Sequence, residues 1–203
     1  MDTRRTAIWE ACLLEFSEKG FDRASTNSIA ERAGVSKGLV FHYFGSKERL
    51  YRELVEQCVA DVEAYVLSET PEGMSFVGTM IRLSEVKLQY FKTHPRHFSL
   101  LMQAFYNPPE HHREVIQAIY GKMLARAREM VRQLLTLLPM RPETDPERAL
   151  DLVMAISGII EGRHSGRFKA ETVLSEPLYQ EMRDDYTAYL ELLLHGISRE
   201  DPL

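Results

Sequence analysis

Apolar side chains recur every three or four residues along most of the chain, which is the spacing of an amphipathic α-helix. Ile8, Cys12 and Phe16 begin this pattern, and Trp9 and Leu13 widen the apolar stripe. The sequence lacks the alternation of apolar and polar residues that is typical of strands, and glycine and proline fall between long periodic segments. The sequence therefore predicts an all-α protein.

Glycine and hydroxyl residues divide the first fifty residues into short helices. A helix predicted over Thr3–Lys19 ends at Gly20, because glycine accepts the left-handed backbone that often follows a helix. Phe21 then begins a short connector. The side-chain oxygen of Ser25 or Thr26 is expected to cap the next helix.

This second helix is predicted over Asn27–Ala33, and Gly34 ends it. Val35 is expected to be buried in the corner, and Ser36 caps a third helix that ends at Phe44. The inward-facing residues of the second helix are Ile29, Ala30 and Ala33. Helices this short are marginal alone, so we expect them to pack on one another and on the first helix.

A fourth helix begins after Ser46 with a long apolar stripe, and the helices beyond residue 68 are longer. The stripe consists of Leu50, Leu54, Cys58 and Val62. Loops with proline or glycine separate the later helices. Their predicted ranges are Phe76–Thr93, Phe98–Tyr106, Pro109–Leu138, Pro146–Phe168 and Pro177–Ser198.

The segment Ile29–Ser36 fits the turn of a helix-turn-helix motif. Alanines at the crossing allow the two helices to approach closely, Gly34 makes the turn, and Ser36 caps the second helix. In such a motif the second helix lies in the major groove of DNA.

The sequence from Phe21 to Lys47 resembles the DNA-binding signature of TetR-family regulators. It contains IAERAGVSKG at 29–38, the aromatic run HYF at 42–44, and a short turn that ends in Lys47. The resemblance covers about residues 5–55, and the rest of the chain is similar to the family only in length and helical layout. It implies an N-terminal three-helix helix-turn-helix DNA-binding domain over residues 1–50 and a C-terminal helical bundle over residues 51–203 for effector binding and dimerisation.

The resemblance also implies that the third helix contacts DNA. Lys37 is expected to reach a guanine or a phosphate, and Gly38 leaves room for close approach of the backbone. Leu39 departs from the family pattern, which often has a hydroxyl residue there, so it either touches a thymine methyl group or turns inward. The alternative for Lys37 and Lys47 is that they are ordinary solvated charges on the surface. The expected DNA contacts are Thr26, Asn27, Lys37, Gly38, Leu39, His42, Tyr43 and Lys47.

The middle helices are rich in methionine and aromatic residues, which line adaptable apolar pockets and also fill ordinary cores. A ligand of such a pocket would be apolar or amphipathic, for instance a lipophilic drug or a fatty-acyl compound. The candidate ligand-binding residues are Met80, Phe98, Met102, Phe105, Tyr106, Tyr120, Met123 and Met154.

The last two helices have broad apolar faces that favour a four-helix bundle with a second copy of the chain, and the resemblance implies the same. A dimer reads two half-sites of a palindrome. The alternative for the leucines is the core of one chain. The candidate interface residues are Leu150, Val153, Ser157, Glu161, Tyr186, Leu190, Leu193 and Leu194.

Composition and charge agree with a globular protein without strongly favouring a partner. Of the 203 residues 44% are apolar, and the net charge is −5. Residues 1–50 carry a net charge of +1 and residues 51–203 carry −6, so the predicted DNA-binding domain is the less acidic part. No apolar run is long enough to span a membrane, and the N-terminus does not resemble a signal peptide, so we expect a cytoplasmic protein without a membrane partner. Cys12 and Cys58 are too few for a disulfide framework and are expected to be buried apolar residues.

These features predict a repressor that binds a palindromic operator as a homodimer and leaves it when a small molecule binds. A ligand-independent DNA-binding protein or an activator is the alternative. A helical enzyme is more remote, because the GxSxG, HExxH, P-loop and dinucleotide motifs are missing, and no metal or cofactor is expected. The candidate residues of such an enzyme would be the pairs His94 and His97, His111 and His112, and Glu161 and His164.

Overall fold

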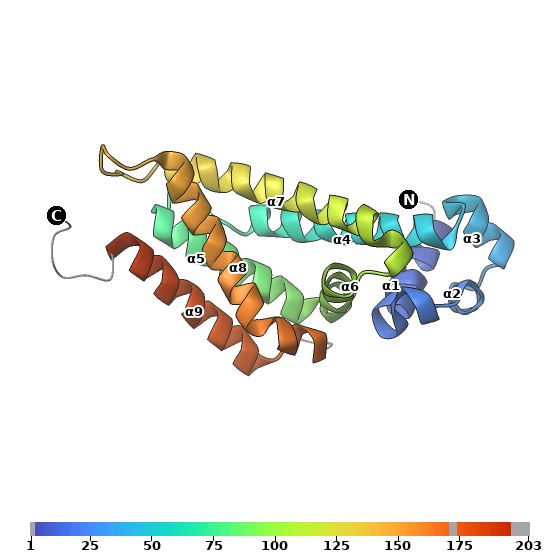
Figure 1. The fold of residues 1–203 in the computed structure, drawn as a ribbon. Helices are drawn as coiled ribbons and strands as arrows, with labels where there is room; N and C mark the ends of the chain where they lie inside the picture. The colour runs from blue at the N-terminus through green and yellow to red at the C-terminus, as the bar shows by residue number, and fades with distance from the viewer. Residues whose placement is uncertain (1–2, 171–173, 196–203) are drawn as a thin grey trace.

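The computed structural model describes residues 3–170 and 174–195, and every regular element within them is a helix (Figure 1). In chain order they are α1 (Thr3–Arg23), α2 (Thr26–Arg32), α3 (Lys37–Phe44), α4 (Lys47–Ser68), α5 (Phe76–Thr93), α6 (Pro95–Tyr106), the 3-10 helix η1 (Glu110–His112), α7 (Arg113–Leu135), α8 (Pro146–Ala170) and α9 (Glu176–His195). The predicted all-α class is thereby confirmed.

The regular helical backbone that begins at Thr3 breaks at Gly20, where the sequence predicts the end of the first helix. Gly20 has φ 70° and ψ 174°, in the region that glycine tolerates, and a further helical turn then carries Phe21 to Arg23. The predicted connector at Phe21 is therefore wrong. The turn re-forms because the Phe21 ring packs against Phe16 and Tyr51, with ring centres 6.3 and 5.1 Å away.

Three serines begin the next three helices as the sequence predicts. The hydroxyl oxygens of Ser25, Ser36 and Ser46 each accept a hydrogen bond from the backbone N–H three residues later, at 3.5, 3.2 and 3.1 Å. Ser25, not Thr26, is thus the cap of α2. Ile29 and Ala30 are buried, whereas Ala33 and Val35 are only half-buried because they lie at the edge of the turn.

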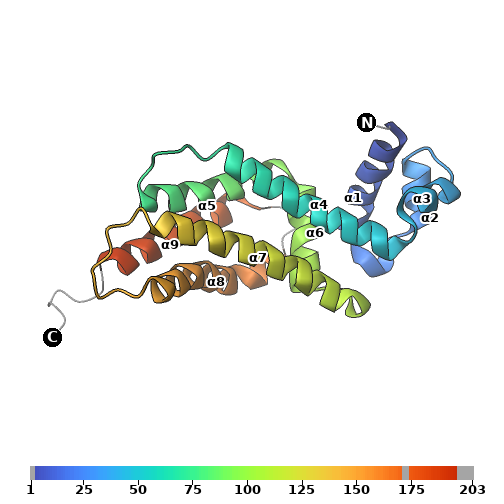
Figure 2. The ribbon, with the colours of Figure 1, turned by 90° about the horizontal axis from the view of Figure 1, so that it is seen from above.

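The helix α4 passes without a break from the N-terminal helices into the rest of the chain. It crosses the predicted domain boundary between residues 50 and 51, and its predicted stripe is buried on both sides of that point. We call α1 to α3 the head and α5 to α9 the body; α4 joins the two (Figures 1 and 2).

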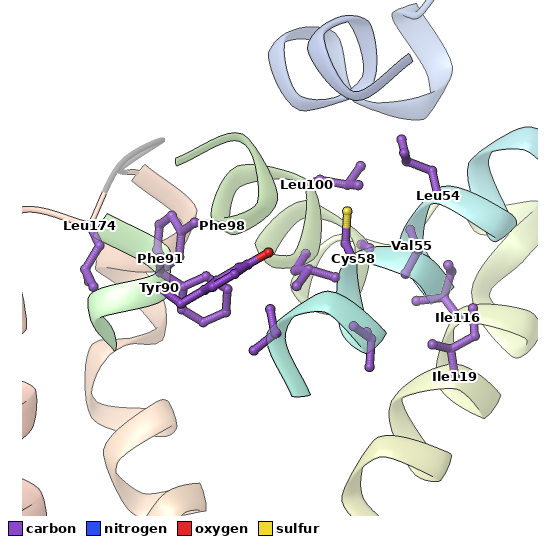
Figure 3. Close-up of a cluster of buried hydrophobic side chains, with 14 of the residues drawn as sticks. Leu54, Val55, Cys58, Tyr90, Phe91, Phe98, Leu100, Ile116, Ile119 and Leu174 are labelled. Carbon is purple, nitrogen blue, oxygen red and sulfur yellow. The ribbon is translucent and has the colours of Figure 1, made fainter. Parts of the chain in front are cut away.

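The body is a bundle in which α8 packs beside α9 and α7, and α9 packs beside α5 (Figure 2). The helix predicted over Pro109–Leu138 is in fact η1 followed by the shorter α7, and the predicted end of the last helix at Ser198 lies outside the described residues. Side chains from α4, α5, α6 and α7 share one apolar core (Figure 3). None of the helices in the described residues is long and apolar enough to cross a membrane.

Both cysteines are free and buried, as predicted. Cys12 lies in the head core, whereas Cys58 lies on α4 among the apolar side chains of Figure 3. Burial raises the pKa of each thiol to about 12, with smaller contributions from nearby carboxylates. Neither thiol is therefore reactive at neutral pH.

Candidate nucleic-acid interface

The connection between α2 and α3 is a tight turn built on Gly34. Gly34 has φ 65°, which favours glycine, and its N–H donates to the Glu31 carbonyl at 3.1 Å. The N–H of Val35 donates to the Ala30 carbonyl at 3.0 Å. The backbone itself therefore fixes the geometry at which α3 leaves α2.

The helix α3 has a buried inner face and an exposed outer face. Val40 and Phe44 are each 1% exposed and anchor the helix in the head core. Lys37, Gly38 and His42 are exposed on the other side. Figure 1 places α2 and α3 at the end of the molecule farthest from α9, so a DNA duplex can approach this face.

The remaining predicted DNA contacts lie around this face and differ in their exposure to solvent. Asn27 is exposed, Thr26 is half-buried, and Leu39 and Tyr43 are half-buried on α3. Lys47 is turned toward the head: its Nζ lies 4.5 Å from the centre of the Phe21 ring and 3.5 Å from the Asp22 carbonyl oxygen. A phosphate contact by Lys47 therefore requires its side chain to rotate outward.

A buried carboxylate holds the start of α2 against α1. Glu15 has no exposed surface, and its oxygens accept hydrogen bonds from the Ser25 N–H, the Ser28 hydroxyl and the Lys19 ammonium at 3.0, 3.0 and 2.8 Å. Burial alone would raise the pKa of Glu15, but these hydrogen bonds outweigh it and hold the pKa below the ordinary value. Glu15 is a positioning residue that the sequence did not reveal.

The head also makes a polar contact with α6. The Ser99 hydroxyl and the Gln103 amide both donate to the Ser17 carbonyl, at 2.8 and 2.7 Å. Ser17 lies in the last turn before the Gly20 break, where carbonyl groups lose their regular helical partners. More than 80 residues separate the two sides, so no local sequence signal predicted this contact.

The candidate ligand-binding residues come from α5 to α8. Met80 and Phe98 are buried in the core, and the other six are half-buried. The rings of Phe105 and Tyr120 lie 4.9 Å apart and bring α6 to α7. Two surface hollows of about 280 and 350 Å³ are lined by other residues, so the predicted ligand site stays a prediction.

The structure places half of the candidate interface residues in the core of a single chain. Leu150, Val153, Tyr186 and Leu190 are between 0 and 8% exposed, so they have almost no surface left to bury against a partner. Ser157 is half-buried and is hydrogen-bonded to Tyr186, whose pKa burial raises to about 12. The remaining three are Leu193 and Leu194, which are half-buried, and Glu161, whose side chain lies outside the described residues.

Both of the last helices carry other apolar side chains on their surface. Leu152 and Ile159 of α8 are 56% and 48% exposed, and Leu192 of α9 is 48% exposed. The sequence missed them because α8 is apolar on both faces, so periodicity alone does not tell which face lies inward.

Three of the candidate histidines contact tyrosine or aspartate side chains. Nδ1 of His97 is hydrogen-bonded to the Tyr90 hydroxyl at 2.6 Å, and His94 stacks on the Tyr90 ring. His164 is buried beside Asp185, with Nε2 and Oδ2 3.2 Å apart, and this pair joins α8 to α9. Within the described residues, no three His, Cys, Asp or Glu side chains converge as a metal ion would require.

Comparison with known proteins agrees with this geometry. Residues 8–54 match the family described as bacterial regulatory proteins, tetR family. The regulator RutR of Escherichia coli K12 is 31% identical over 96 residues, which are 47% of this chain and 45% of RutR. UidR from the same organism is 37% identical over 79 residues, or 38% of this chain and 39% of UidR. The chain thus matches less than half the length of these curated relatives.

Solved structures are similar over nearly the whole chain. A putative TetR-family regulator from Mesorhizobium loti has a TM-score of 0.72 at 20% identity and covers 96% of this chain and 98% of its own. FadR from Bacillus subtilis, solved with stearoyl-CoA, has a TM-score of 0.69 at 14% identity and covers 96% of this chain and 100% of its own. At these identities the similarity shows the fold. Residues 8–54 thus match the tetR family of bacterial regulatory proteins in sequence, and the whole chain has the fold of solved TetR-like regulators.

Proposed function

We propose that this protein is a transcriptional repressor that binds a palindromic operator as a homodimer and is released by a small apolar or amphipathic ligand. The observation that carries this proposal is the exposed outer face of α3, held at the end of the molecule by the buried Val40 and Phe44. As a DNA-binding protein without a membrane partner, it acts in the cytoplasm.

In this proposal α3 enters the major groove. Lys37 reaches guanine O6 and N7 or a nearby phosphate, and Gly38 lets the backbone approach the bases. His42 and Tyr43 donate hydrogen bonds to phosphates. At the flanks, Thr26 and Asn27 begin α2 on one side and Lys47 begins α4 on the other. Phosphate is attracted to such helix N-termini.

The proposed dimer forms through the outer faces of α8 and α9. On α8 the exposed residues Leu152, Ala155, Ile159 and Gly162 are spaced by three or four positions, as in a helix that packs along a partner. Leu192 extends the apolar surface onto α9. Leu193, Leu194 and Ser157 border this surface, whereas the buried candidates of the sequence support it from within.

The ligand is proposed to bind among the half-buried methionines and aromatic residues of α6, α7 and α8. The similar FadR structure contains stearoyl-CoA, which supports an apolar or amphipathic ligand for this chain. The contact of Ser99 and Gln103 with Ser17 offers a route from α6 to the head. A ligand that favours one position of α6 would thereby change the population of heads spaced for DNA.

The test is the salt dependence of binding to labelled duplexes of random sequence. The logarithm of affinity falls with the logarithm of salt concentration by about 0.9 for each phosphate neutralised. We expect Lys37→Ala to reduce this slope by about one. Lys122→Ala is the matched control, because Lys122 is an exposed lysine of α7. Equal slopes for the two variants would exclude a phosphate contact by Lys37.

A further inference from the structure

A hollow of about 280 Å³ lies where α4 leaves the head and meets the start of the body. Its wall includes Arg49, Tyr51, Arg52, His112, Val115 and Ile116. These residues come from α4, η1 and α7, and none is among the expected DNA contacts or ligand-binding residues. His112 also touches the head directly, since its ring meets the Phe21 ring edge-on at 4.5 Å.

The cations of the hollow differ in how far they are neutralised. Nε of Arg49 donates to the Glu53 carboxylate at 2.7 Å, so its charge is paired. Arg52 is exposed, and within the described part of the chain no hydrogen bond or ion pair engages its guanidinium. An unpaired guanidinium presents donors in the fork that suits a carboxylate.

Tyr51 also lines this hollow. The residue is 2% exposed, and its ring is held by Phe16 and Phe21 at 5.1 Å each. The Tyr51 hydroxyl has no hydrogen-bond partner among the described residues. Every fully buried side-chain oxygen or nitrogen of the described residues does have a partner, so the Tyr51 hydroxyl is not fully buried. The hydroxyl therefore keeps contact with solvent, and the hollow is where Tyr51 lines an open space. Burial, with a smaller effect of Asp22, raises the pKa of Tyr51, so the group is protonated and has a hydrogen to donate.

The size and the remaining wall restrict the ligand further. The volume equals about nine water molecules at about 30 Å³ each, so only a small molecule fits. Val115, which is 40% exposed, and Ile116 supply an apolar side. Glu48 also lines the hollow, and the Ser46 hydroxyl and its own N–H lower the pKa of its carboxyl group, so it stays negative. That charge disfavours a second anionic group on the ligand.

We propose that this hollow binds a small organic monocarboxylate. Arg52 pairs with the carboxylate, the Tyr51 hydroxyl donates a hydrogen bond to it, and the apolar part of the ligand packs on Val115 and Ile116. Because α4 and α7 both line the hollow, a bound acid would hold the start of α4 against the body and change the affinity for DNA. That consequence rests on the proposed DNA-binding function, whereas the binding of the acid does not.

Isothermal titration calorimetry of the full chain with benzoate and with hexanoate tests the proposal, with benzyl alcohol as the neutral probe. We expect saturable binding of at least one acid and none of the alcohol. Arg52→Gln should weaken binding about tenfold, as the loss of a charged hydrogen bond does. Tyr51→Phe, which keeps the ring packing, should weaken it several-fold. Arg141→Gln, at an exposed arginine between α7 and α8, should leave it unchanged.

Melting followed by circular dichroism shows that each variant is folded. Absence of binding by both acids, or equal binding by the wild type and Arg52→Gln, would overturn the proposal. If neither acid binds and Arg52→Gln lowers the salt slope of DNA binding by about one, the proposal is also overturned. Arg52 would then contact the DNA backbone. Either result leaves the role of Lys37 untouched.

Discussion

Glu15 shows how one buried side chain positions the start of α2 within the head. It accepts hydrogen bonds from the Ser25 N–H and the Ser28 hydroxyl at the start of α2 and from Lys19 of α1. Nothing in the local sequence marks it as different from other helical glutamates. The exposed Lys37 and the buried Phe44 were predictable, because the helix-turn-helix pattern specifies both faces of α3. A residue whose partners are brought together only by folding, such as Glu15, was not.

Glu15→Gln is expected to lower the free energy of unfolding by about 1–3 kcal/mol, because an amide presents hydrogens where the carboxylate accepts them. The pKa of Glu15 is lower in the folded chain than its ordinary value, so its stabilising effect is present above the unfolded pKa and is lost as pH falls through the folded pKa. The wild type should therefore lose more stability than the variant on acidification below about pH 4.5. Urea unfolding at several pH values measures this. Glu10→Gln, at an exposed site of the same helix, is the control, and an equal effect of both changes would contradict the role of Glu15.

Gly20 and Gly121 give opposite predictions for the same substitution. A Cβ atom at Gly20 would lie 2.9 Å from Gln103 Oε1 on a backbone with φ 70°, so Gly20→Ala should destabilise the chain by about 1–2 kcal/mol. Gly121 lies within α7 with open space around it, so Gly121→Ala should stabilise by about 0.5–1 kcal/mol. Thermal melting compares them, and a shift of the same sign in both would contradict this reading of the break in α1.

Besides α4, the helix α6 joins the head to the body. The helix α6 and its apolar face could be predicted from the sequence, because both depend on local patterns. The serine caps of α2, α3 and α4 could be predicted for the same reason. The packing of α6 on α1 depends on residues that are distant in the sequence. The outward face of α8 was equally hidden, because Leu150 and Leu152 are both apolar and only the fold separates them.

Ser99 and Gln103 are expected to substitute for each other in holding the Ser17 carbonyl. Ser99→Ala or Gln103→Ala alone leaves one donor in place and should cost about 1 kcal/mol or less. The double variant leaves a carbonyl without its partners from α6 and should cost more than the two single changes together. Urea unfolding of the four proteins measures this, and additive effects would show that the two donors act independently.

At the scale of the whole molecule, the proposed function needs two heads held at a fixed spacing. In the proposed dimer the body provides this spacing through the outer faces of α8 and α9, far from α3 (Figure 2). The sequence predicted these two helices, but half of the residues that it indicated for the interface lie on their buried faces. The sequence of one chain does not show which apolar side of a helix a second copy covers.

Ile159→Glu should therefore convert the dimer to a folded monomer. Ile159 is 48% exposed in the single chain, so a glutamate there is solvated in the monomer and buried only in the dimer. Sedimentation velocity measures the mass and circular dichroism the helix content. Leu137→Glu, at a site that is 63% exposed beyond the end of α7, is the control. A dimer that survives Ile159→Glu would place the interface elsewhere.

Selection of bound sequences from a random duplex pool tests most directly whether α3 reads DNA. We expect the wild type to enrich a palindrome whose half-sites are read by two copies of α3, and the double variant Lys37→Ala, Tyr43→Ala to enrich none. Failure of the wild type to enrich any sequence at moderate salt, or the same palindrome from both proteins, would contradict this expectation.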